Sequence, residues 1–181
     1  AHDGIIVLPD TAIPGTPAAE YYHLESDWVI DIDITANRAD ALSHYGVARD
    51  LYAWLVQRGY KTSLHRPNCS AFHVDNESLP IDVEIENHEA CKRYACVSIT
   101  NCEVRESPMW LQEKLNTIGL RPINNIVDIT NYVMMAYGQP MHCFDADMVK
   151  GHKIVVRTQP EGTKFVTLDG EEHVLGAHDL S

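Results

Sequence analysis

The sequence predicts an α+β fold in which helices pack on a mixed or antiparallel sheet. Two stretches, 28–34 and 81–86, alternate apolar and acidic residues, which is the pattern of half-buried strands. Apolar residues at helical spacing, flanked by capping residues, occupy other parts of the chain. Strands and helices do not alternate strictly, so repeated strand–helix units of the α/β type are disfavoured.

The first 66 residues are expected to form a loop, a strand and a helix, in that order. Three prolines and one glycine between Leu8 and Pro17 indicate a loop with turns. The strand is the stretch 28–34. A helix should follow the strand, with Gly59 just past its end. Its candidate capping residues are Thr35, Asn37 and Asp40.

Residues 67–77 are interpreted as a linker, and a second region, 78–181, begins with the strand 81–86. Residues 94–99 are expected to form its partner strand. A helix should follow, with Ser107 as its cap, Pro108 as its first residue and Gly119 at its end. Another helix, 125–137, is stopped by Gly138. The remaining expected strands are 153–158, 164–168 and 171–175, the last two joined by a tight turn at Asp169-Gly170.

Composition excludes several classes of protein. No apolar run approaches the roughly 20 residues that span a membrane. The formal charge of −12 makes the chain a poor ligand for nucleic acid by itself, so a stand-alone RNA-binding module fits poorly. The five cysteines are odd in number and form no CxxC pair, which disfavours a disulfide framework and a structural zinc site. A reducing, cytosolic setting follows.

Simple catalytic motifs are missing from the sequence. The ten histidines include no HxH or HExxH, so no metal site is predicted, and there is no GxGxxG, GxxxxGK[ST] or GxSxG. Cys143 follows His142, but adjacent side chains usually point apart, which favours a buried structural thiol over a nucleophile. The pair Asp145 and Asp147 either orients His142 or caps a turn.

The stretch 121–145 is the richest in chemical groups. It offers a hydroxyl, an amide and an imidazole that together could hold an ester or amide and orient a water; they belong to Thr130, Asn131 and His142. A structural explanation is also open, in which three polar residues cap a helix and Gly138-Gln139-Pro140 is only a turn. Those three residues are Asn124, Asn125 and Asp128.

Three blocks of sequence carry a resemblance to a known family. RPINNIVDITNYVMMAYGQPMHCFDAD (121–147) closely resembles a signature of the bacterial-type phenylalanyl-tRNA synthetase beta subunit. DIDITANRADALSHYGVARDLYAWL (31–55) and VVRTQPEGTKFVTLDGEEHVL (155–175) are similar to other segments of that family. The blocks occur in the family's order and the resemblance spans roughly residues 4–180.

The resemblance implies a place in a larger enzyme. In that family the beta subunit pairs with a catalytic alpha subunit in an α2β2 assembly, which charges phenylalanine tRNA using ATP and Mg²⁺. Residues 1–66 would follow the oligonucleotide-binding domain, and residues 78–181 would be the first part of the editing domain, within which the sequence is cut. The family's location is the cytoplasm, and no contact with membrane or DNA is implied.

The resemblance also implies roles for single residues. Carried over residue by residue, the editing pocket that hydrolyses tyrosine from phenylalanine tRNA includes Thr130, Asn131 and His142 as substrate-binding residues, with His142 also as the catalytic residue. No cofactor is expected in this chain. The isolated chain is expected to be inactive, because the rest of the pocket lies beyond Ser181. The alternative is a structural and docking domain of the synthetase without editing activity.

Overall fold

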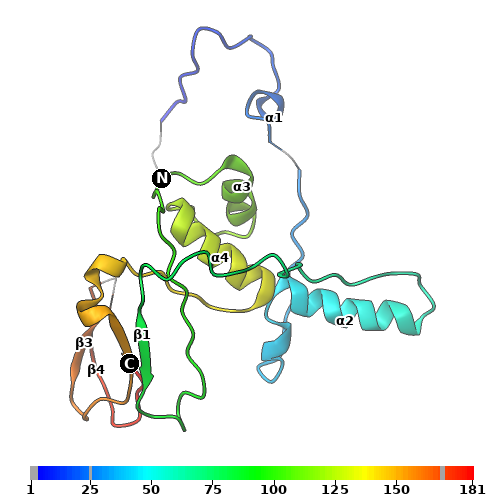
Figure 1. Cartoon of the computed structure of the whole chain (residues 1–181). Helices are drawn as coiled ribbons and strands as arrows, with labels where there is room; N and C mark the ends of the chain where they lie inside the picture. Colours follow the sequence, from blue (N-terminus) through cyan, green and yellow to red (C-terminus); the bar gives the residue numbers. More distant parts are fainter. Residues whose placement is uncertain (1–3, 25, 168–169) are drawn as a thin grey trace.

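The computed structural model describes residues 4–24, 26–167 and 170–181, and Figure 1 shows their arrangement. The α+β class is confirmed. The helices are α1 (Ala18–Tyr21), α2 (His44–Gln57), α3 (Met109–Thr117) and α4 (Asn125–Tyr137), and short 3-10 turns cover Ala39–Ala41, Ala146–Met148 and Lys150–His152. The strands are β1 (Asp82–Ile85), β2 (Lys153–Val156), β3 (Lys164–Val166) and β4 (Glu172–Val174).

Helix α4 has the bounds that the sequence predicted. The side chain of Asn124 accepts hydrogen bonds from the backbone N–H groups of Ile126 and Val127, both at 3.0 Å, and so caps the first turn. At the other end Gly138 adopts a left-handed conformation, with φ of 78°, that a residue with a Cβ rarely takes. The start signal at Asn124 and the stop signal at Gly138 are both local, which is why the sequence located this helix correctly.

Helices α3 and α4 pack together around side chains that are among the best buried of the described residues. Leu111 and Leu115 on α3 are each 1% exposed. The Trp110 ring meets the edge of the Tyr132 ring on α4, with centroids 5.7 Å apart. The predicted cap was wrong: Pro108 occupies the cap position of α3, and the Ser107 hydroxyl bonds elsewhere.

The first turn of helix α2 contacts the C-terminal half of α4, and the rest of α2 projects away from the molecule (Figure 1). The His44 Nδ1 donates to the carbonyl oxygen of Met135 at 2.9 Å, and the Tyr45 and Tyr137 rings lie 6.2 Å apart.

The end of α2 agrees with the prediction, whereas its cap does not. Gly59, with φ of 80°, follows the helix as expected. The cap is Ser43, which accepts from the Gly46 N–H at 2.9 Å, and not Thr35, Asn37 or Asp40.

The sheets consist of two separate strand pairs among the described residues. β1 pairs in parallel with β2, with Asp82 opposite Lys153. β3 pairs antiparallel with β4, with Lys164 opposite Val174. Strands β3 and β4 are the two strands of the expected hairpin, each shorter than predicted. Asp169 of the expected turn lies outside the described residues.

Two of the predicted strands are wrong. Residues 94–99 form no strand, since β1 takes β2 as its partner instead. Residues 28–34 are extended but pair with no other described segment, and Trp28 is 93% exposed. Alternation of apolar and polar residues shows which side chains would share a face of a strand. A strand also needs a neighbouring backbone with which to form hydrogen bonds, and the alternation does not identify it.

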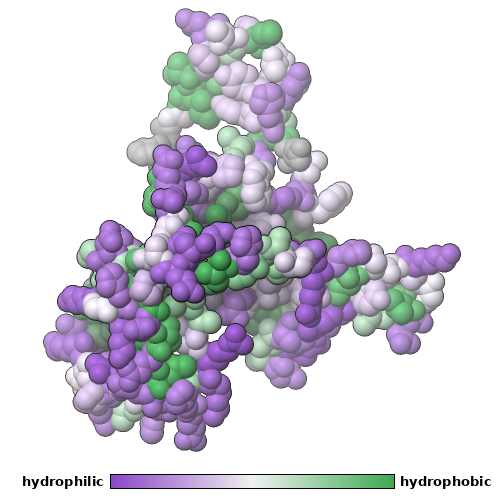
Figure 2. Space-filling view, viewed as in Figure 1, coloured by the Kyte–Doolittle hydropathy of each residue, from purple (hydrophilic) through white to green (hydrophobic). Residues whose placement is uncertain are grey.

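The described part of the chain buries little apolar surface. Its buried apolar side chains are Ala41, Leu111, Leu115 and Val156. Figure 2 shows apolar residues exposed on the N-terminal segment, on α2 and near β1. Among the described residues, no helix combines the length and apolar composition needed to cross a membrane.

Candidate functional site

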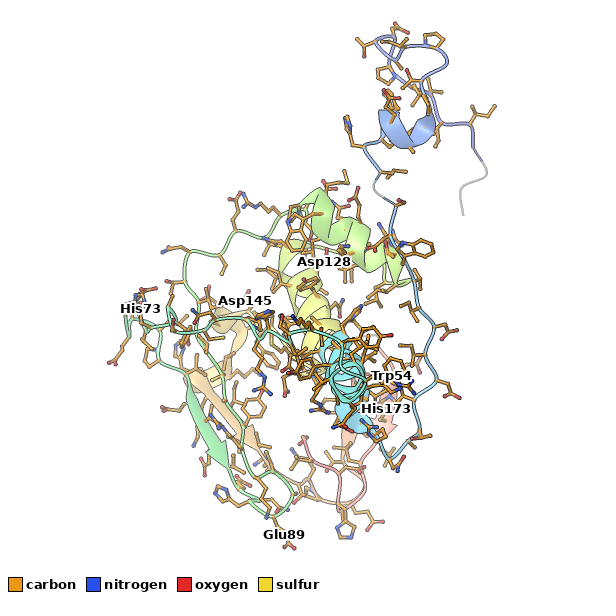
Figure 3. All side chains as sticks on the ribbon, turned by 90° about the vertical axis from the view of Figure 1, so that its right-hand side faces the viewer. Trp54, His73, Glu89, Asp128, Asp145 and His173 are labelled. Carbon is orange, nitrogen blue, oxygen red and sulfur yellow. The ribbon has the colours of Figure 1, made fainter. Side chains whose placement is uncertain are left out.

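A buried polar cluster fixes the start of α4. Asp128 has no exposed surface, and Figure 3 labels it where α3 and α4 meet. One carboxylate oxygen accepts from the Ser107 hydroxyl at 2.5 Å, and the other accepts from the backbone N–H of Ile123 at 2.9 Å. Ser107 is itself 5% exposed. The cluster therefore ties α4 to the segments before both helices.

Asn125 forms a second tie between α4 and the segment 103–105. Its side-chain amide donates to the carbonyl oxygen of Glu103 at 3.0 Å and accepts from the Arg105 N–H at 3.0 Å. Its backbone N–H donates to the Arg105 carbonyl at 2.9 Å. Three hydrogen bonds from one residue fix the register of the extended segment against the helix.

The structural roles foreseen for the Asn and Asp residues of this stretch are thus partly confirmed. Asn124 caps α4, whereas Asn125 and Asp128 tie the helix to other segments. Sequence reasoning did not foresee the pairing of Asp128 with Ser107. The available signal was an acidic residue set one helical turn after the cap, inside the apolar run Ile126–Ile129.

Two of the three predicted site residues lie on α4. Thr130 is 9% exposed, and its hydroxyl donates to the carbonyl oxygen of Val127, three residues earlier, at 2.7 Å. Asn131 is half-buried, and its side-chain amide takes part in none of the hydrogen bonds found among the described residues. The Asn131 amide is thus the more available of the two for a ligand.

His142 lies after α4 in an exposed segment without regular structure. Its ring is 6.2 Å from that of Phe144, with an angle of 31° between the planes. Across the described residues, no hydrogen bond joins this imidazole to Thr130, Asn131 or any other group. The structure thus does not link the predicted catalytic residue directly to the predicted binding residues.

The neighbours of His142 also differ in part from expectation. Asp145 caps the 3-10 turn that follows it and accepts a hydrogen bond from the Asp147 N–H at 3.1 Å. This confirms the interpretation that the Asp145 and Asp147 pair caps a turn. Cys143 is exposed, so the prediction of a buried thiol was wrong. Within residues 4–24, 26–167 and 170–181, no three potential ligands among His, Cys, Asp and Glu gather as a metal site would require.

The charged cluster at the start of α2 lies on another part of the fold. Arg38 bonds to Asp40 at 2.9 Å and to Asp50 at 2.5 Å, and Arg49 pairs with Asp40. The hydrogen bond from Arg38 lowers the pKa of Asp40, and the bond to Asp40 raises the pKa of Arg38. These exposed pairs hold the turn Ala39–Ala41 against α2.

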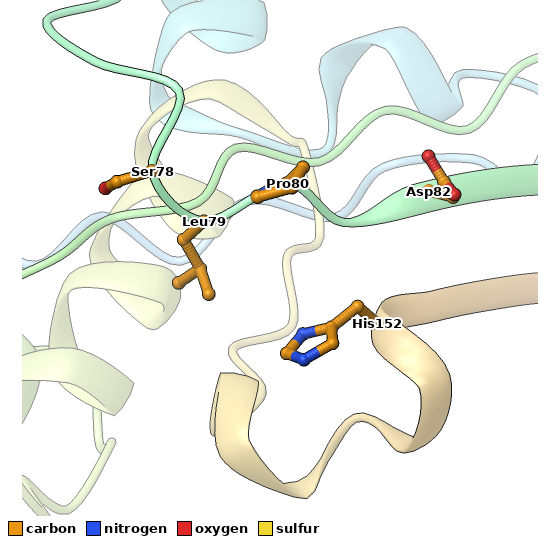
Figure 4. A pocket seen from close by; sticks show the side chains of 5 residues that line it. All are labelled: Ser78, Leu79, Pro80, Asp82 and His152. Atoms are coloured by element: carbon orange, nitrogen blue, oxygen red, sulfur yellow. The ribbon is translucent and has the colours of Figure 1, made fainter.

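Two open hollows occur near the strand β1, and neither is lined by a predicted site residue. One, of about 370 Å³, lies between the segment Ser78–Pro80, Asp82 and His152 (Figure 4). The other, of about 440 Å³, is lined by residues 71–76, Leu79 and 97–100. Neither hollow therefore holds the candidate site residues, which lie on α4 and in the segment after it.

Comparison with known protein families identifies the family of the region that contains the candidate site residues. Residues 90–180, half of the chain, match the B3/4 domain. The chain belongs to the B3/4 domain family. The B3/4 match takes in α3, α4 and β2–β4, and therefore Thr130, Asn131 and His142.

Relatives of this B3/4 chain extend the similarity over nearly its whole length. It is 61% identical over 180 residues to the phenylalanine–tRNA ligase beta subunit of Bacteroides fragilis, 58% over 179 residues to that of Bacteroides thetaiotaomicron and 53% over 180 residues to that of Porphyromonas gingivalis. Each alignment covers 99% of this chain and 22% of the relative. The chain thus spans about a fifth of these relatives, and the family resemblance seen in the sequence is confirmed. The division at residues 66 and 78 stays a prediction.

Proposed function

We propose that this chain is part of the beta subunit of a phenylalanine–tRNA ligase and contributes to hydrolytic editing of tyrosyl-tRNA for phenylalanine. The observation that carries the proposal is the 61% identity over 180 residues to a protein of that name, together with the B3/4 match. The same proposal includes an alpha subunit and phenylalanine tRNA as partners, and the cytoplasm as location.

Editing has a physical reason in this system. Tyrosine is phenylalanine with one added hydroxyl, and an apolar pocket rejects such an isostere only by a modest factor. A second site that hydrogen-bonds the hydroxyl supplies the missing selectivity, because phenylalanine would leave its polar groups unpaired. The reaction adds water across the ester: water attacks the carbonyl carbon, the bond to the ribose oxygen breaks, and tyrosine and tRNA result.

The proposed roles follow from what each side chain has available. Asn131 presents an amide that is free of hydrogen bonds within the described residues, suited to the ester or the terminal adenosine. Thr130 lies beside it with its hydroxyl proton held by the Val127 carbonyl, which leaves the oxygen as an acceptor. His142 is exposed, so its imidazole can orient the attacking water.

The cofactors of the complete synthetase belong to this proposal as well. ATP and Mg²⁺ serve there to activate phenylalanine, and this chain takes no cofactor of its own. It supplies side chains that bind and orient the aminoacyl end of the tRNA. The remaining part of the editing pocket is proposed to come from sequence outside these 181 residues.

A structural role is the second candidate, favoured by the apolar surface. Trp28 is 93% exposed, Ile30 77% and Phe72 68%, and such exposed apolar groups suit contacts with further protein. In this alternative the segment supports the subunit and docks other parts of the synthetase, without editing.

The test is deacylation of tyrosyl-tRNA for phenylalanine by the complete alpha–beta enzyme with His142→Ala. We expect a loss of about 100-fold or more with aminoacylation unchanged, since a positioned proton-transfer group contributes at least that much. His73→Ala is the matched control, because His73 is also exposed, and its ring bonds to the Asp75 carboxylate and the Ala71 carbonyl oxygen, away from Thr130, Asn131 and His142. Unchanged deacylation would remove His142 from the chemistry, and a wild type unable to deacylate would favour the structural role.

A further inference from the structure

We infer that Asp128 is a positioning residue for the editing site, acting through its hydrogen bonds to Ser107 and Ile123; the inference rests on the proposed function. Asp128 does not reach the substrate. It fixes the turn of α4 that carries Asn131 and, beside it, Thr130. Residues three apart on a helix share a face, so Asn131 lies one turn beyond Asp128 on the same side of α4.

The burial of Asp128 marks it as unusual. A carboxylate with no exposed surface is costly unless it is well paired, yet none of the ion pairs between described residues includes Asp128. Its partners are two neutral donors, the Ser107 hydroxyl at 2.5 Å and the Ile123 N–H at 2.9 Å.

The two donors come from separate parts of the chain. Ser107 comes just before Pro108, the cap residue of α3, and Ile123 lies in the connection between α3 and α4. The carboxylate therefore sets α4 relative to both, and Gln112 on α3 extends the tie by donating to the Ser107 carbonyl at 2.7 Å. A change in this cluster moves α4 as a unit, and with it the groups proposed to hold the ester.

Replacing Asp128 separates positioning from general stability. In the complete enzyme, Asp128→Ala should lower kcat for tyrosyl-tRNA deacylation by about 100-fold, the size expected for a misplacement of about 1 Å. The KM for tRNA and the rate of aminoacylation should not change. Asp128→Asn should retain activity within about threefold, because its amide can donate to Ser107 while its carbonyl accepts from Ile123.

Two further variants complete the test. Ser107→Ala keeps the carboxylate and removes one donor, and we expect an intermediate loss of about 10-fold in deacylation kcat. The Ser107→Ala/Asp128→Ala double variant should be no slower than Asp128→Ala, since both changes break one unit. Thr117→Ala is the control, because it removes a hydrogen bond internal to α3, from Thr117 to the Glu113 carbonyl.

The outcomes distinguish this inference from the function on which it rests. Full deacylation kcat in Asp128→Ala or Ser107→Ala, against a large loss in His142→Ala, overturns the positioning role alone. A parallel fall of aminoacylation and deacylation also overturns it, since that would show general damage. Full activity in both His142→Ala and Asp128→Ala removes the proposed editing site, and the inference with it. Should Asp128→Ala fail to fold, Ser107→Ala and Asp128→Asn still decide the question.

Discussion

Gly46 in α2 offers a prediction whose sign runs against the usual rule. Replacing a helical glycine with alanine normally stabilises a helix by about 0.5–1 kcal/mol. Here a Cβ would lie 2.4 Å from the Asp40 carbonyl oxygen and 2.7 Å from the Ala41 Cα. Both atoms belong to the backbone, so no flexible side chain can yield. Ordinary contact begins at 3.4 Å, and α2 must therefore move by roughly 1 Å from the turn before it.

The structure sets the size of the effect. Overpacking of this kind costs about 3 kcal/mol at its upper end, and the gain in helix propensity offsets up to about 1 kcal/mol. Gly46→Ala should then weaken α2 by about 2 kcal/mol. Hydrogen exchange of the α2 amides, followed by mass spectrometry in the complete subunit, should become about 30-fold faster.

The control variant is Ala53→Gly, at an exposed position of the same helix. It lowers helix propensity without any change in packing, and should cost about 1 kcal/mol. If Gly46→Ala instead slows exchange in α2, then the close approach of Gly46 to the Ala41 backbone does not control the stability of this helix, and the reasoning fails.

Two other predictions concern the core and one strand pair. Leu111→Ala should destabilise the α3–α4 pair by about 2–5 kcal/mol, whereas Leu111→Met should cost less than about 1.5 kcal/mol. The free energy of unfolding is measured in urea. A loss below about 1 kcal/mol for the alanine variant would contradict the packing of Leu111 between the two helices. Lys153 lowers the pKa of Glu84 by its hydrogen bond, and Glu84 raises the pKa of Lys153 in return. The pair should therefore support β1–β2 pairing between about pH 4.5 and 10.5, losing it as pH falls through the lowered pKa of Glu84 or rises through the raised pKa of Lys153. An NMR titration should show the Glu84 midpoint higher in Lys153→Met, and an unmoved midpoint would refute the pairing.

Local signals made parts of the fold predictable. The cap at Asn124 and the glycine at 138 defined α4, and Gly59 marked the end of α2, because each acts within one helical turn. Ser107 was misjudged because a serine before a proline resembles a cap. Its actual partner, Asp128, lies 21 residues away.

The alternation of apolar and polar residues could not predict which strands pair when they are far apart in the sequence. The stretch 81–86 was correctly expected to contain a strand, but the nearest stretch of strand character, 94–99, was not its partner. The residues of the candidate site were named from the sequence, yet their arrangement was not foreseen. Thr130 and Asn131 share a helix turn, whereas His142 lies in an exposed segment with no hydrogen bond to either within the described residues.

The parallel pairing of β1 with β2 has a consequence for the order in which this chain folds. Asp82 and Lys153 are 71 positions apart in the sequence, and the chain between them must close into a loop before they meet, which is a slow step compared with helix formation. The α3–α4 pair lies wholly within that loop and can form earlier from near neighbours. During synthesis, β1 must therefore wait for its partner while the helices fold, and its exposed edge is open to wrong pairing in the meantime.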